Sequence, residues 1–170
     1  MGIRRFRGMS VYVVMGVSGS GKTTVAEALA KKFDGLYLDA DDFHPAANKA
    51  KMAAAIPLTD DDRWPWLDTL NTELQRHAKD KRCVFLACSA LRQIYRDRLA
   101  RNLDGLQFIY LKGSKECIRE RMEARKDHFM PAALLDSQFA VLEEPRDAIV
   151  VSIADSLPHI IDKLSAQIAR

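Results

Sequence analysis

The chain has 170 residues, of which 48% are hydrophobic and 29% are charged; this length and composition predict one globular domain rather than a disordered chain. No apolar run approaches the roughly 18 residues of a membrane-spanning helix, so no membrane association is expected. The net charge is +3, and three arginines lie within the first eight residues. The other charges balance, which argues against a nucleic-acid partner. Three cysteines, an odd number without CxxC spacing, are typical of a reducing compartment, so a cytoplasmic location is expected.

The first nine residues are basic and lack the apolar segment of a signal peptide, so we expect a flexible tail at 1–9 and a single domain over 10–170. Short apolar runs then alternate with segments of helical periodicity. Strands are predicted at residues 11–15, 36–38, 83–88, 106–111 and 148–153. Helices are predicted at residues 22–33, 45–55, 60–79, 91–102, 114–125, 132–142 and 156–168. Strands that are apolar on both faces and separated by helices predict an α/β fold, with a five-stranded parallel sheet covered by helices on both faces.

Residues 16–23 match the phosphate-loop pattern G-x-x-x-x-G-K-[ST] without a mismatch, between a predicted strand and a predicted helix. The glycines let successive backbone N–H groups converge on a phosphate, and the helix N-terminus adds partial positive charge. Lys22 can bridge the β- and γ-phosphates, and the Thr23 hydroxyl can hold Mg²⁺. The motif therefore predicts a P-loop NTPase fold with ATP and Mg²⁺ as cofactors. The candidate ATP-binding residues here are Gly16, Val17, Ser18, Gly19, Ser20, Gly21, Lys22, Thr23 and Thr24.

The class of P-loop protein depends on residues outside this loop. A Ras-type GTPase needs Asn-Lys-x-Asp, but Asn48-Lys49 is followed by Ala50-Lys51. Motor and transporter ATPases usually carry an acid at the end of a strand beside the loop, whereas the strand at 83–88 is followed by Ser89. The acid instead follows the strand at 36–38, as Asp39. This layout is typical of small-molecule and nucleotide kinases.

Asp39 and Asp41 are the central acceptor-site candidates, because ligands bind at the carboxyl edge of open α/β sheets. Asp39 either orients a water on Mg²⁺ or accepts the proton of an attacking hydroxyl, which makes Thr23 and Asp39 the candidate metal site. Asp41 can accept hydrogen bonds from substrate hydroxyls; for Asp42 a helix cap is an equally good interpretation. These acids disfavour a dianionic nucleoside monophosphate and favour a polyhydroxy acceptor in the region 41–79.

Further substrate-binding candidates are His44 and Asn48, which can share the acceptor's hydroxyls, and Arg63, which can face an acceptor carboxylate or form a surface ion pair with the preceding acids. Arg121 and Arg125 are four residues apart and share a helix face before a loop. Arg121 can stack on adenine, and Arg125 can reach the transferring phosphoryl group. Residues 125–133 are therefore expected to form a lid that closes over the site.

With these residues in view, the sequence resembles the gluconate kinases (gluconokinases) of the shikimate-kinase-like group, from about Tyr12 to about Val151. Beyond the phosphate loop, the resemblance rests on the segments Pro57–Leu67, with its Asp-Arg-x-Pro-Trp-Leu run, Cys88–Leu91 and Gln138–Pro145. The resemblance implies phosphorylation of D-gluconate at its 6-hydroxyl to 6-phospho-D-gluconate, with ATP and Mg²⁺. It also implies a homodimer, catalytic roles for Lys22, Asp39 and Arg125, and substrate contacts by Arg96 and Gln138.

The chain departs from the family pattern at four positions. Ala55 and Asp127 stand where members often carry Gly, and Ser152 and Ala154 where members often carry Asp. Two alternatives to gluconate phosphorylation are a kinase of the same fold acting on shikimate or another sugar acid, and a nucleotide-binding regulatory module without turnover.

Overall fold

The structure, a computed structural model, describes residues 10–125 and 132–168. The tail predicted at 1–9 and residues 126–131 of the predicted lid lie outside the described residues. Five parallel strands form one sheet in the order β2-β3-β1-β4-β5. The strands are β1 (Val11–Met15), β2 (Leu36–Asp39), β3 (Val84–Ala87), β4 (Gln107–Lys112) and β5 (Ala148–Ser152). The predicted α/β fold with a five-stranded parallel sheet is thereby confirmed.

Seven α-helices occur in the described residues, each close to its predicted span. They are α1 (Lys22–Lys32), α2 (Ala46–Ala53), α3 (Asp60–Lys79), α4 (Gln93–Ala100), α5 (Lys115–Glu123), α6 (Ala132–Val141) and α7 (Leu157–Ile168). A single 3₁₀ turn, η1 (Ala40–Phe43), was predicted only as an acidic loop. The span of α3 agrees with the prediction at both ends, because Thr59 and Asp62 form a capping box that fixes its start.

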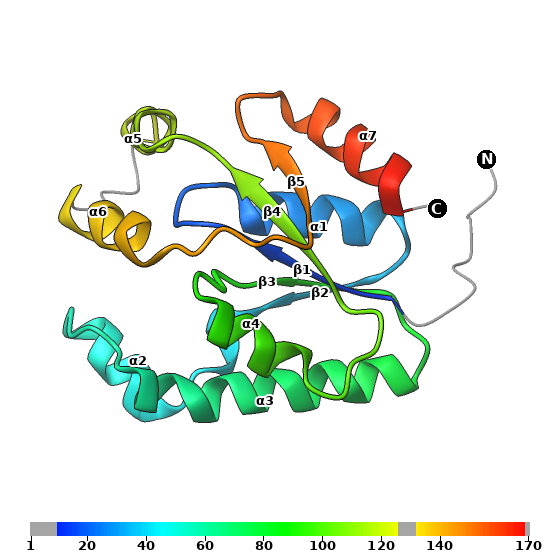
Figure 1. The fold of residues 1–170 in the computed structure, drawn as a ribbon, viewed down its shortest axis with the longest axis horizontal. Coiled ribbons are helices and arrows are strands. Elements are labelled where there is room, and N and C mark those ends of the chain that lie inside the picture. Colours follow the sequence, from blue (N-terminus) through cyan, green and yellow to red (C-terminus); the bar gives the residue numbers. More distant parts are fainter. Residues whose placement is uncertain (1–9, 126–131, 169–170) are drawn as a thin grey trace.

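The strands are apolar on both sides because the sheet separates two cores. Val11, Val13 and Met15 of β1 face one core, which contains residues of α3 and α4. Tyr12 and Val14 face the other, which contains residues of α1 and α7. Figure 1 shows these helix pairs on opposite sides of the sheet. Successive side chains of β1 point to opposite faces of the sheet, so β1 contributes buried residues to both cores.

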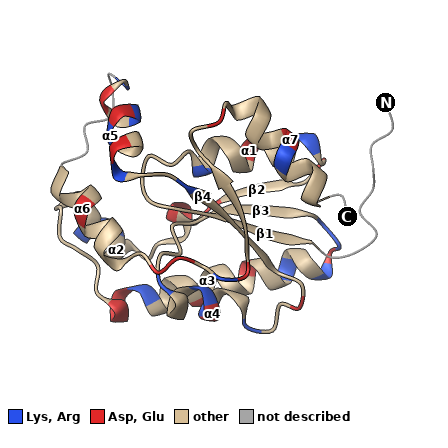
Figure 2. Ribbon diagram, turned by 45° about the horizontal axis from the view of Figure 1, so that its top comes forward, with Lys and Arg blue, Asp and Glu red and all other residues tan. Residues whose placement is uncertain are grey.

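The strand order places the segments after β1, β2 and β3 next to one another at the carboxyl edge of the sheet. Helices α2, α5 and α6 lie around this same end of the molecule, away from the two chain termini (Figure 1). Charged residues of both signs occur on α3, α4 and α5, whereas the strands carry few (Figure 2). Within the described ranges, none of the helices combines the length and apolarity that a membrane span requires.

Candidate active site

The phosphate loop connects β1 to α1 and takes the conformation that its glycines permit. Gly19 has φ +79°, and an added Cβ would lie 2.9 Å from both Cγ and Sδ of Met122 on α5. A side chain there would therefore be strained and would push the loop and α5 apart. Lys22 opens α1 and donates from Nζ to the Val17 carbonyl at 3.0 Å. Burial lowers the pKa of Lys22.

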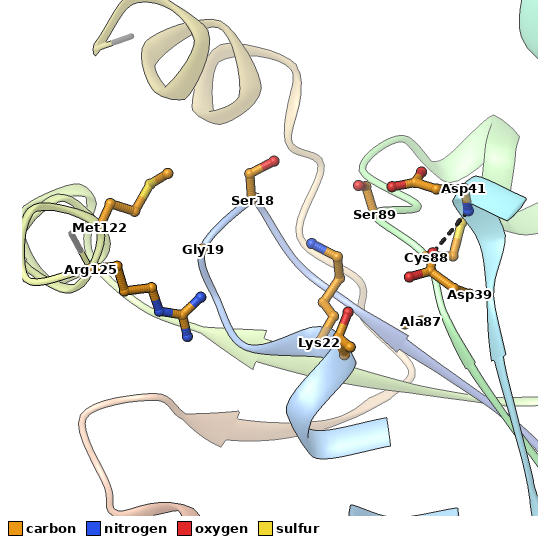
Figure 3. A pocket seen from close by; sticks show the side chains of 11 residues that line it. Ser18, Gly19, Lys22, Asp39, Asp41, Ala87, Cys88, Ser89, Met122 and Arg125 are labelled. Carbon is orange, nitrogen blue, oxygen red and sulfur yellow. Dashed lines mark hydrogen bonds between the residues drawn. The ribbon is translucent and has the colours of Figure 1, made fainter. Parts of the chain in front are cut away.

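A cavity of about 500 Å³ lies between the phosphate loop, the ends of β2 and β3, and α5 (Figure 3). Residues predicted for the site that line this cavity are Ser18, Gly19, Lys22, Thr23, Asp39, Asp41 and Arg125. Lining residues that the sequence interpretation missed are Ala87, Cys88, Ser89 and Met122. In Figure 3, Lys22 lies between the Arg125 side of the cavity and the Asp39–Asp41 side. The cations Lys22 and Arg125 and the carboxylates Asp39 and Asp41, from distant parts of the chain, therefore line the same cavity.

Asp39 is held in place through both of its carboxylate oxygens. Oδ1 accepts from the Asp41 backbone N–H at 2.9 Å, and Oδ2 accepts from the Tyr37 hydroxyl at 3.2 Å. Asp39 therefore caps the 3₁₀ turn and also lines the cavity. Its role as a cap does not prevent it from binding Mg²⁺ or accepting the proton of the attacking hydroxyl.

Asp41 is the second carboxylate of the cavity. Its pKa is raised mainly by partial desolvation and, to a smaller extent, by the negative charge of Asp39. His44 lies behind it, with Nε2 3.8 Å from Asp41 Oδ1. His44 is buried, stacks on Trp66 at 4.1 Å and accepts at Nδ1 from the Asn48 amide at 3.2 Å. Asn48 is buried as well and does not line the cavity. The two side chains therefore hydrogen-bond to each other behind Asp41, and their substrate contacts stay predictions.

Arg63 lies near the start of α3, outside the cavity lining. It donates from Nη1 to the Leu58 carbonyl at 2.7 Å, and the same nitrogen lies 3.7 Å from Asp60 Oδ1. Asp60 is engaged more closely by the Tyr95 hydroxyl at 2.5 Å and by Arg92 at 2.8 Å. The long ion pair and the 30% side-chain exposure leave the Arg63 guanidinium with donors free for an acceptor anion.

Three other predicted residues contact protein groups rather than the cavity. Arg96 is 2% exposed and donates to the carbonyls of Ala90 and Glu143, so it ties α4 to the segment after α6. These contacts place Arg96 outside the cavity lining, and its expected substrate contact stays a prediction. Gln138 contacts the phosphate loop at Ser18. Arg121 donates to the Ile153 carbonyl just after β5.

Sequence signals existed for some of the missed residues. Tyr37 is two residues before Asp39 in a strand, so the two side chains share a face. Met122 lies near the end of α5 and precedes the predicted site residue Arg125 by three positions. Ser89 follows β3 at the carboxyl edge, where ligand-binding residues concentrate. The Gln138 contact spans 120 residues, and no local pattern marks it.

The donor set of the cavity fits a phosphate-bound Mg²⁺ ion. Among the described residues, no group of three or more His, Cys, Asp or Glu side chains could hold a metal by itself. Mg²⁺ commonly takes one or two protein oxygens, several waters and substrate phosphates. Thr23 and Asp39 both line the cavity and supply a hydroxyl and a carboxylate for such a site.

Comparisons with known proteins agree with this geometry. A family described as AAA domain matches residues 11–145. The thermoresistant gluconokinase of Escherichia coli K12 is 43% identical over 155 residues, which cover 89% of each chain. A probable gluconokinase of Mus musculus is 46% identical over 170 residues, covering 88% of this chain and 92% of the relative. The chain belongs to the gluconokinase family.

A crystal structure of a gluconokinase from Sinorhizobium meliloti 1021 matches with a TM-score of 0.87 and 43% identity, covering 98% of this chain and 94% of that one. The APS kinase CysC of Mycobacterium tuberculosis matches with a TM-score of 0.71 at 15% identity, over 96% of this chain and 99% of its own. At that identity the second likeness shows a shared fold alone. The gluconokinases and this distant kinase therefore have the same P-loop kinase fold as the present chain.

Proposed function

We propose that this protein is a gluconokinase, which transfers the γ-phosphoryl group of ATP to the 6-hydroxyl of D-gluconate and yields 6-phospho-D-gluconate. The observation that carries the proposal is one cavity lined by Lys22 and Thr23 of the phosphate loop, by Asp39 and Asp41, and by Arg125. The family relationship supports gluconate as the acceptor.

Phosphoryl transfer depends mainly on positioning and on stabilisation of negative charge. Lys22 would neutralise the β- and γ-phosphates, and Arg125 would reach the transferring group from the opposite side of the cavity. Thr23 and Asp39 would hold Mg²⁺, which supplies further charge neutralisation when bound. Met122, which lines the cavity beside the phosphate loop, would help to restrict water, which is a competing acceptor.

Asp41 and Arg63 would orient the acceptor. Asp41 faces the cavity and can accept a hydrogen bond from a hydroxyl near the reacting one. Arg63 lies on the side of α3 that carries Asp60, where a cation can bind the gluconate carboxylate. A short anionic polyol extended between these two groups would place one terminal hydroxyl toward the phosphates.

A panel of acceptors in a coupled assay of ADP release tests the proposal. The panel contains D-gluconate, shikimate, other sugar acids and uncharged polyols of the same length. We expect D-gluconate to give the highest kcat/KM, and polyols to be poor acceptors because they lack a carboxylate. A higher kcat/KM for shikimate or another acid would overturn the assignment of substrate. ADP release that no acceptor increases would favour a regulatory nucleotide-binding module.

A further inference from the structure

The side chain of Gln138 on α6 binds Ser18 of the phosphate loop through two hydrogen bonds. Its Oε1 accepts from the Ser18 backbone N–H at 2.7 Å, and its Nε2 donates to Ser18 Oγ at 2.9 Å. A carboxamide is suited to this pairing because it presents an acceptor and a donor side by side. The contact joins residues 120 positions apart in the sequence.

The bond to the Ser18 N–H fixes a whole peptide unit. The Ser18 nitrogen and the Val17 carbonyl belong to one planar group, in which the N–H and C=O point in opposite directions. The Val17 carbonyl accepts from Lys22 Nζ at 3.0 Å and from the Ser20 N–H at 3.2 Å. Gln138 and Lys22 therefore hold the same peptide from its two sides.

Helix α6 is anchored independently of Gln138. Leu135 is 2% exposed within a hydrophobic core, and Phe139 packs against that core. Asp136 forms an ion pair of 3.0 Å with Lys115 on α5. Beyond the helix, the Glu143 N–H donates to the Leu91 carbonyl at 2.8 Å. Gln138 thus projects from a fixed helix, and its removal should free the loop without releasing α6.

We propose that Gln138 is a positioning residue of the phosphate loop. It orients the Val17–Ser18 peptide, and through the Val17 carbonyl it sets the resting position of the Lys22 ammonium group. A freed peptide would let the Lys22 Nζ move from the position at which it meets the phosphates. Small misplacements of a group that stabilises the transition state lower turnover more than they lower binding.

The first test is turnover, and this arm alone rests on the proposed function. Gln138→Leu keeps a side chain of similar bulk and a similar helix propensity but removes both hydrogen bonds, so kcat with gluconate should fall about tenfold or more while the KM for ATP changes only a few-fold. Gln138→Glu keeps an acceptor for the Ser18 N–H and should retain more kcat. Ser18→Ala loses only the hydroxyl contact and should change kcat a few-fold at most. Ser137→Ala, on the exposed side of α6, is the matched control.

The second test uses nucleotide alone and does not depend on the acceptor. The affinity of a non-hydrolysable ATP analogue is measured by calorimetry for Gln138→Leu and Gln138→Glu, in the wild-type and Lys22→Ala backgrounds. If Gln138 acts through Lys22, Gln138→Leu should weaken binding with Lys22 present and add little in its absence. Equal weakening in both backgrounds, or a kcat within twofold of wild type for Gln138→Leu, would overturn the proposal. A wild-type protein that binds the analogue but does not phosphorylate gluconate would contradict the proposed function only.

Discussion

The Tyr37 hydroxyl donates a 3.2 Å hydrogen bond to Asp39 Oδ2, and the Asp41 backbone N–H donates to Oδ1 of the same carboxylate at 2.9 Å. Tyr37 thus helps to fix the orientation of one of the two residues proposed to hold Mg²⁺. Burial raises the pKa of Tyr37, so the phenol keeps its proton and remains a donor at neutral pH. The hydrogen bond to Asp39 gives a role to Tyr37, a residue of β2 that belongs to none of the sequence motifs.

Tyr37→Phe should remove one of the two hydrogen bonds that orient the Asp39 carboxylate, while leaving the core intact. We expect kcat to fall several-fold and the Mg²⁺ concentration for half-maximal activity to rise, because a less firmly oriented Asp39 would hold the metal less well. A Mg²⁺ titration of initial rates measures both effects. Tyr12→Phe, at a buried tyrosine on β1, is the matched control and should leave the Mg²⁺ requirement unchanged.

Arg63→Ala should raise the KM for gluconate at least tenfold and leave the KM for ATP nearly unchanged. The reason is the loss of a charge-assisted contact to the acceptor carboxylate. Arg76→Ala removes the same charge at the far end of α3, where Arg76 pairs with Glu73, and should change neither constant. Equal effects of Arg63→Ala on both substrates, or on an uncharged polyol as much as on gluconate, would show that Arg63 acts structurally.

Ala55 takes the left-handed conformation, with φ +55°. Gly takes this conformation without strain, whereas a residue with a Cβ takes it at a cost. Ala55→Gly should raise the free energy of unfolding by about 0.5–1 kcal/mol, since relief of strain exceeds the added entropy of the unfolded chain. Denaturant unfolding measures the change. Ala54→Gly is the control: Ala54 has φ −87°, so the same substitution there should destabilise the protein.

His44 should make stability depend on pH. Burial lowers its pKa below the ordinary value of 6.5, so below about pH 6.5 the unfolded chain binds a proton that the folded protein resists. The free energy of unfolding should therefore decrease as pH falls from 7.5 to 5.5. His44→Gln should reduce this slope, and His77, whose pKa is also lowered by burial, should account for part of the remainder. Urea unfolding across this pH range measures the slope; an unchanged slope in His44→Gln would contradict the account.

The fold could be predicted from the sequence because its determinants are local. The apolar runs of β1 and β3, the capping box of α3 and the phosphate-loop motif each specify an element within about ten residues. The 3₁₀ turn at Ala40–Phe43 was missed because Asp39 caps it from the preceding strand, an interaction that composition does not distinguish from an acidic loop.

The site could be predicted only where residues follow the ends of strands or lie within motifs. Lys22, Asp39 and Asp41 meet this condition, and the structure brings them together. His44 and Asn48 carry polar groups in the right segment, but their burial beneath Asp41 depends on Trp66 and α3. The buried position of Arg96 likewise depends on carbonyls that only the folded chain brings together.

The central claim is the transfer of the γ-phosphoryl group to the 6-hydroxyl of gluconate in the cavity around Lys22. The most direct measurement is a single-turnover reaction of excess enzyme with ATP and D-gluconate, with the product examined by phosphorus–proton correlation in NMR. We expect one phosphorylated product whose phosphorus couples to the protons on carbon 6, and no product with a folded Lys22→Ala variant. ATP consumption without that product, a phosphate on another hydroxyl, or near-normal transfer by Lys22→Ala would contradict it.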